Sequence, residues 1–209
     1  PGPGNHTYVY LYLCLIFLVI FLNRPQHHES LLIANTRNLF MVIMLMAVVQ
    51  KILTPGYLDG TVNAFWLANG GYFKPLYFFS ENWQEVVESN HALLNDYYNE
   101  TLYRTDNIVL QSPVGNLQLW GFLCTLLILG GEILVPLLFV SKRSQLVRHG
   151  ALIAMIVIVF LTRQEAGFLC LLCIIGIANC PPGEKRVLSI YLALFGLMQL
   201  LFLLDYGYV

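Results

Sequence analysis

The chain has 209 residues, of which 57% are hydrophobic and only 11% are charged, and its formal net charge at pH 7 is −1. Soluble domains carry roughly 25% charged residues, so this composition excludes a water-soluble globule and predicts an integral membrane protein. The charged residues form no basic face, which excludes a nucleic-acid-binding protein.

The first part of the chain predicts two membrane spans separated by a polar turn. An apolar run predicts a span over residues 8–23, and a polar turn is expected over residues 23–35. A second apolar run predicts a span over residues 36–53. Pro55 and Gly56 follow it directly and end the helix, because these residues break regular structure.

Residues 54–115 form the one long segment that is not expected to cross the membrane. Its first apolar pieces are short and interrupted by Gly and Pro, so they are expected to lie at the interface or to re-enter the membrane and return. Ser80 is a suitable N-cap for a helix that starts at Glu81. The apolar residues of this helix recur at helical spacing and are Trp83, Val86, Val87, Leu93, Leu94 and Tyr97. An amphipathic helix on the membrane surface or on the bundle is therefore predicted.

The last part of the chain predicts further spans. Residues 117–140 are long enough to cross a bilayer and carry Glu132 in their middle. The short apolar runs 149–162 and 166–179 predict either a hairpin of two short spans or one long helix with charges in its middle. A last span is expected over 187–204. The predicted fold is thus an all-α bundle of about six transmembrane helices with one long segment outside the membrane.

The distribution of charge predicts the orientation. Basic residues in short loops mark the cytoplasmic side, and here they are Arg24, Arg37, Lys142, Arg143, Arg148, Lys185 and Arg186. Seven acids fall in the long insert, namely Asp59, Glu81, Glu85, Glu88, Asp96, Glu100 and Asp106, against Lys74 and Arg104. Six spans place every basic turn inside, whereas five would put Lys185 and Arg186 outside. Both termini and residues 54–115 are therefore predicted to be extracytoplasmic, together with the glycosylation sequons at Asn5 and Asn99.

Glu132 is the charged residue in the middle of a predicted span. A carboxylate at that depth is costly unless it is paired, protonated or exposed to a polar cavity. The favoured interpretation is a structural tie to a basic residue, with Lys51 as the first candidate and Arg163 as the second. The alternatives are a proton or cation site, a contact to a headgroup or quinone, and a polar cluster with Lys51, Arg163 and Glu165 around a shallow outer cavity.

No cofactor or metal is expected. Four of the five cysteines lie in apolar runs and none lies in the long polar insert, so no structural disulfide is predicted. Cys170 and Cys173 form a C-x-x-C pattern, which is interpreted as two small buried residues in preference to a redox pair. No histidine lies in the middle of a span, which argues against haem ligation, and no metal-binding motif occurs.

Three short motifs resemble a known family. A helix led by Arg37 ends in Gln50-Lys51-Ile52-Leu53, a GYLDG turn follows, and a later helix carries Gly131-Glu132-Ile133-Leu134 before a basic turn. Over roughly residues 36–180 the chain resembles the DoxX-like membrane proteins and the broader horizontally transferred transmembrane domain superfamily, which includes the membrane part of vitamin-K-dependent carboxylases. The resemblance implies a bundle of antiparallel spans, and some members are membrane subunits of redox enzymes such as thiosulfate:quinone oxidoreductase. The first span and the long acidic insert depart from it.

The sequence identifies no reaction, but it is compatible with two functions. The first is an accessory or structural subunit of a larger membrane complex, such as a respiratory or photosynthetic electron-transfer assembly. It would bind membrane lipids, and it would contact other subunits through residues 54–115 and its apolar helix faces. The alternative is a DoxX-like membrane enzyme or transporter for a quinone- or lipid-linked substrate, with a polar site near the outer leaflet built from Lys51, Glu132, Arg163 and Glu165.

Overall fold

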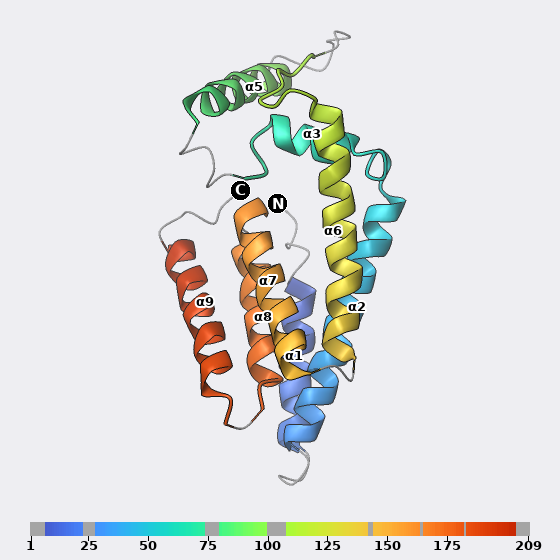
Figure 1. Cartoon of the computed structure of the whole chain (residues 1–209), viewed down its shortest axis with the longest axis vertical. Coiled ribbons are helices and arrows are strands. Elements are labelled where there is room, and N and C mark those ends of the chain that lie inside the picture. The colour runs from blue at the N-terminus through green and yellow to red at the C-terminus, as the bar shows by residue number, and fades with distance from the viewer. Residues whose placement is uncertain are drawn as a thin grey trace. The chain divides into compact units, whose positions relative to one another are not determined.

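The protein is all-helical in the part of the chain that its computed structural model describes. The described residues are 7–22, 28–73, 80–99, 108–141, 144–163, 165–181 and 183–203. Three helices in this part are long and apolar enough to cross a membrane: α2 (His28–Leu53), α6 (Leu117–Val140) and α7 (Gln145–Arg163). Shorter apolar stretches lie in α1 (Thr7–Leu22) and α8 (Ala166–Ala178). Figure 1 shows these elements along the chain. The prediction of a helical membrane protein is supported at this coarse level.

Helix α2 begins earlier than the sequence pattern predicts. The polar turn expected over residues 23–35 is wrong for residues 28–35, because α2 already starts at His28. Asn35 donates a side-chain hydrogen bond of 2.8 Å to the Leu31 carbonyl oxygen, and Thr36 donates one of 2.7 Å to that of Leu32. These polar side chains are thus satisfied by the preceding turn of their own helix, so they do not end it.

The predicted runs 149–162 and 166–179 form two helices, so the alternative of one long helix is wrong. Helix α7 ends at Arg163, and α8 starts at Ala166. Glu165 separates them with a ψ angle of 79°, which is outside the helical range. The last helix, α9 (Lys185–Leu203), follows a short connection and packs along α8, as Figure 1 shows.

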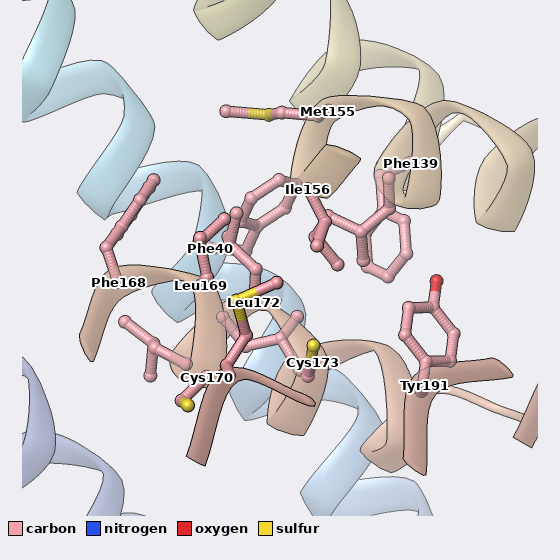
Figure 2. Close-up of a cluster of buried hydrophobic side chains, with 14 of the residues drawn as sticks. Phe40, Phe139, Met155, Ile156, Phe168, Leu169, Cys170, Leu172, Cys173 and Tyr191 are labelled. Carbon is pink, nitrogen blue, oxygen red and sulfur yellow. The ribbon is translucent and has the colours of Figure 1, made fainter. Parts of the chain in front are cut away.

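The chain divides into two compact units. Unit 1 contains residues Pro1–Val49, Gly131–Phe160 and Gln164–Val209, and unit 2 contains Gln50–Gly130 and Leu161–Arg163. The core of unit 1 is built around α8, whose side chains Leu169, Leu171, Leu172, Cys173 and Ile175 are completely buried. Figure 2 shows part of this cluster, including Phe40 and Phe139 in an edge-to-face contact with ring centroids 5.3 Å apart. A helix that is apolar on all sides belongs in the interior, and α8 occupies that position in unit 1.

Unit 2 contains the start of α6 together with two helices of the insert, α3 (Thr61–Ala68) and α5 (Glu81–Asn99). The helix predicted after Ser80 is confirmed as α5, and the Trp83 backbone N–H lies 3.4 Å from the Ser80 hydroxyl oxygen. The inward side of α5 carries Val87 and Asn90 as its buried residues. Leu93, a residue of the predicted apolar stripe, is 43% exposed, so the buried face of α5 is narrower than predicted.

Candidate functional site

The four residues proposed as an outer site are divided between the two units. Lys51, in the last turn of α2, and Arg163, the last residue of α7, belong to unit 2. Glu132 in α6 and Glu165 before α8 belong to unit 1. Lys51, Glu132 and Glu165 are each half-buried. No single unit contains the whole proposed constellation, and the tie between Lys51 and Glu132 stays a prediction.

A buried network of amide and hydroxyl groups lies at the centre of unit 2. The Asn63 side chain in α3 donates a 2.6 Å hydrogen bond from its amide nitrogen to the Thr125 hydroxyl in α6. The Asn63 amide oxygen accepts one of 2.6 Å from the Tyr72 hydroxyl. The Thr125 hydroxyl lies 3.1 Å from the Tyr57 carbonyl oxygen and 3.0 Å from the Gly121 carbonyl oxygen, and its single proton is shared between these two acceptors. The network joins α3, the turn after α2 and α6 through buried groups that satisfy one another.

Two glycines allow this close approach of backbones. Gly60 has a φ of +87°, a conformation that side chains with a Cβ rarely adopt, and it precedes α3. A Cβ at Gly60 would lie 2.6 Å from the Phe122 Cα, and one at Gly121 would lie 2.7 Å from the Ala64 backbone nitrogen. The contact between α3 and α6 therefore requires glycine at both positions.

Asn90 in α5 holds the chain on either side of it. Its amide nitrogen donates to the Ala68 carbonyl oxygen at 2.7 Å and to the Gln111 carbonyl oxygen at 2.9 Å. Its amide oxygen accepts from the Gln111 backbone N–H at 2.8 Å. The backbone N–H of Phe73 adds a 2.8 Å hydrogen bond to the Thr162 carbonyl oxygen in the last turn of α7. One amide side chain and one backbone hydrogen bond thus hold these parts of the insert within unit 2.

A second polar cluster, which the sequence pattern does not predict, lies in unit 1. Arg37 in α2 donates from Nε to the amide oxygen of Asn179, the residue that follows α8, at 2.9 Å. The Asn179 amide nitrogen donates to the Thr36 hydroxyl at 2.9 Å and to the Ile175 carbonyl oxygen at 2.9 Å. Asn179 and Thr36 are buried, so a single amide side chain connects the two helices.

His149 in α7 belongs to the same region of unit 1. Its Nδ1 lies 3.1 Å from the Tyr191 hydroxyl oxygen in α9, and both side chains are buried. The His149 ring also packs edge to face against Phe139 at 6.0 Å and against Tyr191 at 5.8 Å between centroids. Figure 2 shows Phe139 and Tyr191 beside the apolar cluster of unit 1. The sequence does not predict this contact of His149, because Tyr191 is 42 residues away in the chain.

The cysteines are free thiols in the structure. Cys170 and Cys173 are buried in the apolar cluster of unit 1, and their sulfur atoms lie apart in Figure 2. The Cys170 sulfur accepts a 3.1 Å hydrogen bond from the Gln199 side chain. Burial, and secondarily the charge of Glu184, raises the pKa of the Cys180 thiol in the turn after α8. These surroundings suit structural thiols, because reactive cysteines need a lowered pKa and access to solvent.

The two predicted glycosylation sequons fall wholly or partly outside the described residues. Asn5 falls outside the described residues, and Asn99 is the last residue of α5, with the rest of its sequon outside the described ranges. Among the described residues, no three His, Cys, Asp or Glu side chains are grouped as metal ligands would be.

Protein-family models, curated proteins and solved structures show no match to this chain. The resemblance to the DoxX-like proteins therefore stays a prediction, and the function has to be argued from the contacts of the chain's own residues.

Proposed function

We propose that this chain is a multi-pass accessory subunit that is embedded in a larger membrane assembly, such as an electron-transfer complex, and carries no redox cofactor itself. The observation that supports this proposal is that buried polar side chains form hydrogen bonds with one another. Asn63, Tyr72 and Thr125 bond to one another, as do Arg37 and Asn179. Buried polar groups that satisfy each other fix a fold, whereas a catalytic or transport site leaves polar groups directed at a substrate.

The outer surfaces of the helices suit lipid or apolar partners. Large apolar side chains are exposed along α1, α2 and α6, including Phe21, Leu45 and Leu127, which is 74% exposed. Exposed apolar patches of this kind mark membrane or protein contacts. We propose six spans, over α1, α2, α6, α7, α8 and α9, with both termini and residues 54–115 outside the cytoplasm. The basic residues in the turns support this orientation.

Helix α5 offers a surface for a partner of basic character. Glu81, Glu85, Glu88 and Asp96 are exposed, and the helix contains no Lys or Arg. The buried face of the same helix is occupied by contacts within unit 2, so the acidic face is the one available to another subunit. Charge complementarity of this kind controls which partner associates and how fast.

The experiment that tests this proposal is extraction from native membranes in a mild detergent, followed by native electrophoresis of the tagged chain. The expected result is migration in a complex well above the size of the 23.7 kDa chain. The double substitution Glu85→Lys and Glu88→Lys should release the chain from the complex, while Glu132→Gln should lower its abundance. A monodisperse, stable monomer from native membranes would overturn the proposal.

The alternative of an enzyme or transporter requires Lys51, Glu132, Arg163 and Glu165 to converge around one cavity. Lys51 and Arg163 belong to unit 2, whereas Glu132 and Glu165 belong to unit 1. The contacts described within each unit therefore give this site no support. A quinone- or lipid-linked activity of the purified chain that is lost in Glu132→Gln at unchanged abundance would favour this alternative.

A further inference from the structure

Arg37, Arg148 and His149 are connected through Asn179 in unit 1. Arg37 bonds to the Asn179 side chain through Nε at 2.9 Å. The backbone of Asn179 in turn forms a hydrogen bond with the His149 ring, and Arg148 is the residue before His149. The positive charges of both arginines act on the His149 ring, and the charge of Arg148 also acts on Arg37. Arg37 from α2 and the His149 ring from α7 thus both bond to Asn179 at the end of α8, and the charge of Arg148 acts on both of them.

The cluster has more positive than negative charge. Among the described residues, neither Arg37 nor Arg148 forms an ion pair; Arg37 bonds to a neutral amide, and the Arg148 Nε atom is buried with no hydrogen-bond partner. Glu184 is a carboxylate whose charge acts on His149 and partly offsets the arginines. Bringing two guanidinium groups together costs free energy unless an anion compensates them.

We propose that Arg37 and Arg148, with His149 beside them, bind a phosphate group. The bond from Nε of Arg37 to Asn179 orients the guanidinium and leaves its terminal N–H groups for a ligand. Planar guanidinium groups match pairs of phosphate oxygens and bind them with two parallel hydrogen bonds. The His149 ring is already bonded to the Tyr191 hydroxyl at 3.1 Å and to the Asn179 backbone, so it supports Asn179 and leaves the phosphate to the two guanidinium groups.

The position of the cluster suits the headgroup of an anionic lipid as well as free phosphate. Arg148 lies in the first turn of α7, and Asn179 follows the last residue of α8. Both are therefore at helix ends, where lipid phosphates lie if these helices span the membrane. Basic pockets between membrane helices are known to bind anionic headgroups. This inference depends on contacts inside unit 1 and is independent of whether the chain has protein partners.

The test uses the full chain in nanodiscs of phosphatidylcholine, with two probes. Inorganic phosphate is titrated against the protein in these discs, and a second set of discs contains added phosphatidylglycerol. Retained lipid is measured by native mass spectrometry, and binding of either probe is followed by the melting temperature. Stabilisation by phosphatidylglycerol alone would identify a headgroup site, and saturable stabilisation by inorganic phosphate would identify a free-phosphate site.

The variants separate this site from general surface charge. Arg148→Gln removes one guanidinium whose Nε forms no hydrogen bond among the described residues, so the protein should still fold. Its affinity for whichever probe stabilises the wild type, inorganic phosphate or phosphatidylglycerol, should fall about tenfold. Arg37→Gln should lower the affinity similarly but also removes the hydrogen bond to Asn179, so its melting temperature without ligand should fall as well. Arg37→Lys should recover only part of the affinity, because it keeps the charge without the planar fork. Arg186→Gln, which removes an exposed charge at the start of α9, should change little. Wild-type affinity in Arg148→Gln, or an equal loss in Arg186→Gln, would overturn the proposal.

Discussion

At the scale of single residues, two glycines determine how α3 meets α6. Gly121 lies where a methyl group would come within 2.8 Å of the Ala64 Cβ, while the space around Gly130 in the same helix is open for 4 Å among the described residues. Gly130 and Gly131 are also small residues of α6, but a Cβ at either would meet nothing within 4 Å in the described part of the chain, and the close backbone approach occurs at Gly121. Small residues at interfaces allow backbones to come close, but only the partner's position shows which one is used.

We expect Gly121→Ala to lower the free energy of unfolding by about 1–3 kcal/mol, because a tightly packed contact must shift to admit the methyl group. The matched variant Gly130→Ala should stay within about 1 kcal/mol of the wild type, since its side chain would enter open space. Thermal unfolding of both variants in the same detergent measures the difference. Equal losses in the two variants would contradict the proposed backbone contact.

Asp59 gives a prediction on pH. The Thr61 backbone N–H donates to the Asp59 carboxylate at 2.9 Å and holds its pKa below the usual value of 3.8. A carboxyl group whose pKa is lowered by folding stabilises the protein above pH 3.8, and this contribution is lost as the pH falls through the lowered pKa. Asp59→Asn should therefore make the melting temperature less dependent on pH below about pH 4. Melting curves across this range, compared with the wild type, provide the measurement, and parallel curves would contradict it.

At the scale of elements, α5 is an amphipathic helix whose two faces have different partners. Its buried face carries Val87 and Asn90, and Asn90 bonds to the backbone on both sides of the helix in the chain. Its exposed face is acidic. The helix is therefore held by unit 2 through one narrow stripe, and the larger part of its surface is available to water or to a partner.

Val87→Asp should release α5, because it places an uncompensated charge at a position that is 6% exposed. A cost of roughly 2–4 kcal/mol is expected for such a substitution. Leu93→Asp is the matched control, since Leu93 is 43% exposed on the same helix. Hydrogen exchange of residues 81–99 should increase in the first variant and not in the second. Unchanged exchange in Val87→Asp would show that α5 is held by other contacts.

At the scale of the whole molecule, the orientation in the membrane is a prediction from charge. The sequon at Asn99 is expected outside and the turn with Lys142 inside. In a glycosylating host, endoglycosidase should reduce the mass of the chain, and Thr101→Ala should remove the part of this shift due to Asn99. A sequon introduced at residues 141–144 should stay unmodified. Glycosylation of that turn would contradict the six-span topology.

The proposed tie between Lys51 and Glu132 is a second prediction at this scale, because it concerns residues of different units. Lys51→Met and Glu132→Gln, singly and together, form a double-mutant cycle. If the two charges compensate each other, the combined loss of stability should be smaller than the sum of the single losses by about 1–3 kcal/mol. The cycle is measured by thermal unfolding in detergent, and additive losses would exclude a direct tie.

Much of the helical architecture follows from the sequence alone. The apolar run predicted over 117–140 coincides with α6. Helix α5 starts at Glu81 directly after Ser80, as predicted. Pro55 and Gly56 follow the end of α2 as expected. These features depend on neighbours in the chain, on local apolar content, spacing and capping, so they can be read without knowledge of the fold.

The polar contacts inside the protein were decided by tertiary structure. Asn63 and Thr125 are 62 residues apart, and Asn179 and Thr36 are 143 residues apart. The residues around a single amide in an apolar run do not predict its hydrogen-bond partner, because that partner depends on which helix packs beside it. The sequence thus determined that the chain forms apolar helices, and only the packing of those helices decided which buried groups bond to one another.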